Sequence, residues 1–124
     1  MVTKSSPSSV AETVARLERE LEARGVKLFA VIDHSGEAAA AGLRLRDTKV
    51  VIFGNPAAGT PVMEAAPLAA LDLPLKVLIW ADGDQTRINY VDAAELGARY
   101  GLSNELADRL AVIDAITDAA AAAS

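Results

Sequence analysis

Apolar residues in the first part of the chain recur at the spacing of one helical face. The run consists of Val10, Val14, Leu17 and Leu21. Charged residues lie between them, a pattern that predicts an amphipathic helix. Ser9 stands just before this run and Glu12 follows three residues later, which is the spacing of a capping box. We therefore expect a helix from Ser9 to Gly25, where glycine ends it, and a flexible N-terminal arm over residues 1–7.

Four later segments are rich in β-branched and other apolar residues, which is typical of strands. They cover residues 26–33, 50–53, 75–81 and 86–91. The short run 50–53 is continuously apolar, so we expect both of its faces to be buried. Asp82-Gly83-Asp84 joins the last two segments and predicts a β-hairpin.

The remaining periodic segments predict helices between and after these strands. One short helix follows Ser35, and a second begins with Thr60 as N-cap and Pro61 at the first helical position. Asp92 and Ser103 begin the last two. The order is α-β-α-β-α-β-β-α-α. It predicts an α+β fold with a four-stranded, at least partly antiparallel sheet and helices packed on one face, forming a single domain over residues 8–124.

Composition narrows the classes of function. The chain has 124 residues, a formal net charge of -5 and no cysteine. An acidic surface repels phosphate backbones, so we expect no nucleic-acid partner. Without cysteine there is no thiolate nucleophile, and one histidine is too few for a strong metal site, so we expect no metal. No signal peptide or membrane span is predicted, and we expect a cytoplasmic protein without a membrane partner. The sequence specifies no cofactor.

Several blocks of residues resemble the domain-of-unknown-function family 302 (DUF302). They are Asp33-His34-Ser35, Phe53-Gly54-Asn55-Pro56, Gly59-Thr60-Pro61-Val62-Met63, Leu73-Pro74-Leu75-Lys76-Val77-Leu78 and Asn89-Tyr90. The resemblance covers about residues 26–102, and its most specific block is Phe-Gly-Asn-Pro. It implies a small α+β domain with a sheet backed by helices, commonly met as a dimer, and it implies no activity.

The loop from Gly54 to Thr60 is the first candidate site. It follows a predicted strand and opens a helix, where backbone N–H groups can meet a ligand. Its glycine spacing is that of a phosphate-binding loop, but Thr60 stands where the lysine should be. The alternative is structural: Gly54 and Gly59 supply unusual backbone angles, and Asn55 ties the loop by hydrogen bonds. The ligand-binding candidates are therefore Gly54, Asn55, Gly59 and Thr60, with His34 as a further candidate.

His34 is the second candidate and the only catalytic one. Beside Asp33 at a strand end, it could act as a general acid or base, or it could be a turn histidine bonded to backbone. Residues adjacent along a strand face opposite sides, so the two side chains need not share a site. A polar pocket requires the fold to bring His34 close to Asn55.

Three hypotheses of function follow. The first is a small-ligand-binding or interaction module that acts as a homodimer, with its site near the loop Gly54–Thr60. The second is a small enzyme in which His34 is the general acid or base, while Asn55 and loop N–H groups stabilise an oxyanion. The third is a purely structural or assembly role. Scarce catalytic side chains favour the first and leave enzymatic activity uncertain.

Overall fold

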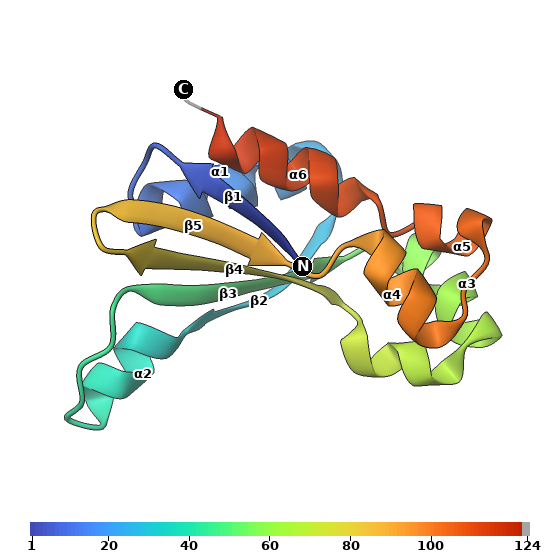
Figure 1. Cartoon of the computed structure of the whole chain (residues 1–124), viewed down its shortest axis with the longest axis horizontal. Helices are drawn as coiled ribbons and strands as arrows, with labels where there is room; N and C mark the ends of the chain where they lie inside the picture. The colour runs from blue at the N-terminus through green and yellow to red at the C-terminus, as the bar shows by residue number, and fades with distance from the viewer. Residues whose placement is uncertain (123–124) are drawn as a thin grey trace.

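The computed structural model describes residues 1–122, which form one sheet and the helices around it (Figure 1). Residues 123 and 124, the end of the domain predicted over 8–124, lie outside the described residues. The strands are β1 (Val2–Ser6), β2 (Lys27–Asp33), β3 (Thr48–Gly54), β4 (Leu75–Asp82) and β5 (Gln85–Tyr90). The helices are α1 (Val10–Ala23), α2 (His34–Ala40), α3 (Pro56–Ala65), α4 (Ala93–Tyr100), α5 (Asn104–Asp108) and α6 (Val112–Ala121), with a 3-10 helix η1 (Pro67–Asp72) between α3 and β4.

The sheet confirms the predicted α+β class but has one strand more than expected. Its order is β1-β5-β4-β3-β2, and every neighbouring pair is antiparallel. The predicted free arm over residues 1–7 is wrong, because Val2–Ser6 pairs with β5 from Val2 opposite Tyr90 to Ser6 opposite Thr86. Ser6 is also buried and shares a 2.7 Å hydrogen bond with the buried Thr13 of α1, so the end of the strand is held against α1 as well as against β5.

One face of the sheet carries the core. Helices α1 and α6 pack on each other and contact the strands. The apolar residues of the predicted α1 stripe are buried, and so are alternate residues of β3, β4 and β5. In β3, Val51 and Phe53 are buried whereas Val50 and Ile52 are only half-buried, so burial on both faces was predicted wrongly for that strand. Helix α1 begins after Ser9 as expected, since the Ser9 side chain accepts a hydrogen bond from the Glu12 N–H.

The other helices gather at the two ends of the sheet. Figure 1 shows α3, η1, α4 and α5 together at the end where β3 finishes, while α2 projects from the opposite end. The predicted last helix is broken in two, with α5 ending at Asp108 and α6 beginning at Val112. No described helix combines the length and the apolar character needed to cross a membrane.

Helix α3 begins five residues earlier than the sequence predicts. Asn55 is its N-cap and Pro56 its first residue, so Asn-Pro and not Thr60-Pro61 starts the helix. Pro61 then lies inside the helix, where it has no N–H to offer the carbonyl of Ala57 four residues back. The capped start nevertheless prevails, because the Asn55 side chain pairs an N–H group that would otherwise lack a partner.

Candidate functional site

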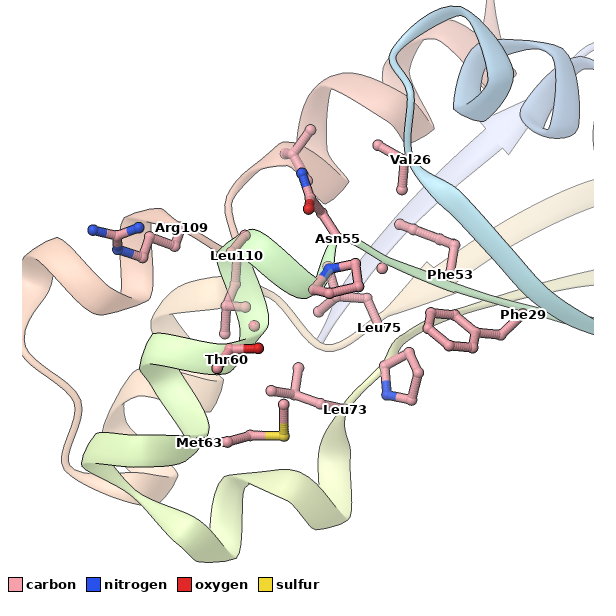
Figure 2. Close-up of a pocket in the computed structure, with 16 residues that line it drawn as sticks. Val26, Phe29, Phe53, Asn55, Thr60, Met63, Leu73, Leu75, Arg109 and Leu110 are labelled. Atoms are coloured by element: carbon pink, nitrogen blue, oxygen red, sulfur yellow. The ribbon is translucent and has the colours of Figure 1, made fainter.

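A pocket of about 280 Å³ lies at the end of the sheet, between the finish of β3 and helix α3 (Figure 2). Its lining residues come from β2 and the residue before it, the end of β3, helix α3 and its N-cap, the start of β4 and the residues before it, and the segment from the α5–α6 connection to the start of α6. They are Val26, Phe29, Phe53, Gly54, Asn55, Pro56, Ala58, Gly59, Thr60, Met63, Leu73, Pro74, Leu75, Arg109, Leu110 and Val112. Most are apolar, and Arg109 is the one charged residue among them.

The floor of the pocket belongs to the hydrophobic core, and its rim is open to water. Phe53 is fully buried, and Leu75 and Leu110 are nearly so. Phe29, on the other hand, keeps 46% of its surface exposed. The pocket is therefore an open depression in the core, lined by rings and aliphatic chains that are held by packing.

The start of α3 leaves no free first-turn N–H group for a ligand. The Asn55 side chain accepts a hydrogen bond from the Ala57 N–H at 2.9 Å. The Asn55 carbonyl accepts from the N–H groups of Ala58 and Gly59, both at 2.9 Å. Pro56 has no N–H at all. The loop thus lacks the array of free donors that a phosphate or an oxyanion requires.

All four loop candidates line the pocket. Gly54 lies between two wall residues: a Cβ added to it would meet Pro74 Cβ at 3.4 Å and Phe29 Cε2 at 3.6 Å. At Gly59 an added Cβ would meet only Met63 Cε, at 3.8 Å. Asn55 and Thr60 are exposed and contribute polar atoms to the wall. Because Gly54 and Gly59 have no side chains, this wall takes up little space, and the pocket stays open beside them.

His34 does not reach this site. Asn55 follows Gly54, which pairs with Lys27 at one end of the β2–β3 ladder, and His34 follows Asp33, which pairs with Lys49 at the other. At about 3.3 Å per residue the two side chains are roughly 20 Å apart. His34 is exposed at the start of α2.

The carboxylate of Asp33, the residue before His34, is occupied by hydrogen bonds from the first turn of α2. It accepts hydrogen bonds from the Ser35 hydroxyl at 2.7 Å and from the Gly36 N–H at 2.9 Å. These two bonds, the Ser35 one foremost, lower the pKa of Asp33. Asp33 is thus the N-cap residue of α2. The enzyme hypothesis requires His34 and Asn55 to share one site, and the structure does not bring them together.

The sequence did not point to most of the pocket walls. Phe29, Met63 and Leu110 are ordinary apolar residues in widely separated segments, and only the fold brings them together. Among residues 1–122, no group of three or more His, Asp or Glu side chains is arranged to hold a metal ion. Chemically, the site can enclose an apolar group; its polar atoms are few and sit at the loop and at Arg109.

Comparison with known proteins agrees with the fold. The family described as "Domain of unknown function DUF302" matches residues 2–121. The crystal structure of an uncharacterized conserved DUF302 protein from Bacillus stearothermophilus superposes with a TM-score of 0.80 at 20% identity. That match covers 97% of this chain and 94% of the other, so the two share a fold.

Curated relatives are similar over most of this chain but are longer. A protein named "Fluoride-specific ion channel FluC 1" from Brucella suis biovar 1 (strain 1330) is 39% identical over 110 residues. The match covers 86% of this chain and 43% of that protein. A protein of the same name from Brucella abortus biovar 1 (strain 9-941) matches equally, over 41% of its length. This chain therefore spans less than half the length of the curated relatives it matches.

Proposed function

Since the chain belongs to the DUF302 family, whose description assigns no activity, we propose that it is a small-ligand-binding module that acts as a homodimer. The pocket of about 280 Å³ beside Gly54–Thr60 is the observation that carries this proposal. A pre-formed, mostly apolar concavity with a few polar groups is the usual form of a small-molecule site. The distance between His34 and Asn55, together with the paired N–H groups of α3, favours binding over acid–base catalysis.

Filling the pocket from Gly59 is expected to abolish ligand binding without unfolding the protein. In Gly59→Leu the new side chain starts where only Met63 lies within 4 Å, and so it occupies pocket space. Leucine also has the higher helix propensity, by up to about 1 kcal/mol. We expect the variant to melt at or above the wild-type temperature and to bind indole, a neutral bicyclic probe, at least about tenfold more weakly, or about 1.4 kcal/mol.

Calorimetric titration with indole and thermal denaturation measure both quantities. Ala94→Leu is the matched control, because Ala94 is an exposed α4 residue that does not line the pocket. It should bind indole as the wild type does. Equal affinity in Gly59→Leu and the wild type would contradict the placement of the site, and absence of binding to the wild type would contradict the proposal for this class of ligand.

The edge strand β2 supports the homodimer. Among residues 1–122 it pairs only with β3, and all seven of its residues are exposed. Leu28, Phe29, Val31 and Ile32 keep 37–46% of their surfaces exposed. The opposite edge, β1, is shorter and mostly polar, with Lys4 and two serines. A long apolar edge invites pairing with another strand, whereas a short polar edge resists it; a second copy of this chain is the occupant that we propose for β2.

Placing a charge on this edge is expected to separate the dimer. Val31→Lys places a lysine on the exposed apolar edge strand, and charged side chains on an edge strand oppose edge-to-edge pairing. The expected solution mass falls from twice 12.9 kDa to 12.9 kDa, as measured by light scattering during size-exclusion chromatography. Leu68→Lys, at a residue 71% exposed in η1 and outside β2, should leave the mass unchanged. A wild type that is monomeric at all concentrations would refute the dimer.

A second candidate function comes from the curated relatives. Because proteins named as fluoride-specific ion channels contain a region 39% identical to this chain, we also propose that the domain accompanies an ion channel. The test is an exchange of the matched 110 residues of the Brucella suis protein for this chain, followed by fluoride efflux from liposomes. Efflux should persist in the exchange and change when the matched region is deleted; unchanged efflux on deletion would argue against this role.

A further inference from the structure

Building on the proposed function, we propose that the ligand is an amphiphile: a neutral hydrocarbon body fills the pocket and a single carboxylate binds Arg109 at the mouth. Within this class, a medium-chain fatty acid is the member that best matches the size of the pocket. The inference rests on the apolar floor, on the volume of the pocket and on the position of Arg109.

The floor accepts only an apolar group. It is made by Phe53, Leu75 and Leu110, whose exposed fractions are 0–6%. A charged or strongly polar group placed there would lose its hydration and gain no partner, which is highly unfavourable. The buried end of the ligand must therefore be a chain or a ring without polar atoms.

The volume sets the length of this apolar part. An apolar cavity of about 150 Å³ is large enough for benzene. The present pocket, at about 280 Å³, is nearly twice that size. It accommodates a bicyclic ring or a chain of about ten carbons, on the same scale.

Arg109 is the residue suited to bind the polar end of the ligand. It lines the pocket, yet its side chain keeps 42% exposure. In Figure 2 its guanidinium points away from the labelled wall residues, toward the outside. Within the described residues, its one ion pair is a 3.8 Å contact with Glu105, which is itself 84% exposed. Such an exposed pair contributes little, so a ligand carboxylate can replace Glu105.

The type of head group follows from the same geometry. The planar fork of a guanidinium matches a carboxylate with two parallel hydrogen bonds. The N-terminal end of α3, at the same pocket, adds partial positive charge. Its first-turn N–H groups are already paired, however, so it cannot hold a phosphate in the manner of a phosphate-binding loop. A carboxylate fits this combination of one exposed guanidinium and no free N–H array.

Decanoate and 1-decanol test the assignment, because they share a ten-carbon chain and differ in the head group. We expect calorimetry below the micellar concentration to give decanoate an affinity at least about tenfold higher than decanol for the wild type. Arg109→Met keeps the aliphatic stem but removes the charge, so it should reduce the ratio to near unity and leave decanol binding intact. Arg109→Lys should retain part of the preference, and Arg44→Gln, at an exposed residue outside the pocket, should retain all of it.

The outcomes separate this inference from the proposed function. Equal wild-type affinities for decanoate and decanol would overturn the carboxylate assignment and leave the binding module in place. A decanoate preference that survives in Arg109→Met would overturn the role of Arg109. Binding of indole without binding of either ten-carbon probe would refute the fatty-chain assignment alone, whereas failure of all three probes would count against the proposed function as well.

Discussion

Replacing Phe53 with alanine is expected to lower the free energy of unfolding by about 3–5 kcal/mol, as for other buried phenylalanines. Phe53 is fully buried on β3, where it is part of the core and also lines the pocket. The substitution deletes a ring that neighbouring side chains cannot replace, so the core loses contacts and the pocket loses part of its floor. Phe53→Ala should therefore lose both stability and defined ligand binding.

Phe29→Ala is the control with the same chemical change at a different depth. Phe29 lines the pocket but is 46% exposed, so much of its ring is already in water and little burial is lost. We expect a decrease below about 1.5 kcal/mol, measured by urea denaturation, and weaker binding of apolar probes. Equal destabilisation by the two substitutions would contradict the division into a core floor and an exposed rim.

Leu17→Ala is expected to destabilise the protein by about 2–5 kcal/mol without affecting the pocket. Leu17 is fully buried at the centre of α1, on the helix that packs with α6 over the sheet. It does not line the pocket. The substitution leaves a void under the helices, while the walls of the site keep their contacts.

Urea denaturation measures the loss of stability in Leu17→Ala, and indole titration at a temperature where the variant remains folded measures binding. Wild-type affinity together with reduced stability is the expected result. Strongly reduced affinity in the folded variant would indicate that the pocket depends on packing beneath α1, contrary to the structure. Together with Phe53→Ala, this variant separates the stability of the core from the shape of the site.

The elements that the sequence predicted well are those with local signals. The α1 stripe, the capping serine and the β4–β5 hairpin each depend on residues close together in the chain, and all three are present. Strand β1 escaped prediction because Val2–Ser6 is mostly polar and resembles an arm. This segment is ordered by its pairing with β5, whose residues are eighty or more positions away in the chain, and no local pattern encodes that pairing.

The start of α3 illustrates a different limit. Both Asn55-Pro56 and Thr60-Pro61 carry the signature of a capping residue followed by proline. The sequence alone does not decide between them, and the structure selects the earlier one. This choice turns the loop into the first turn of a helix, and its N–H groups become bonded within that turn.

The candidate site was predictable only in part. The loop residues Gly54–Thr60 stood out by their glycines and by the resemblance to DUF302, and all of them except Ala57 line the pocket. The other walls, such as Phe29 and Leu110, come from segments that carry no functional signature. His34 looked suited to chemistry but lies at the far end of the β2–β3 ladder. Because β2 and β3 are antiparallel, the end of β2, which precedes His34, and the end of β3, which precedes Asn55, lie at opposite ends of that ladder.

The most direct test of the account is an NMR titration of the ¹⁵N-labelled wild-type protein with indole. We expect a saturable response, with the largest amide shifts in the segments that line the pocket, residues 53–63, 73–75 and 109–112. Such a pattern would support a binding module whose site is the core-floored pocket beside α3. Shifts centred on His34 and α2, or no saturable shift at all, would contradict it.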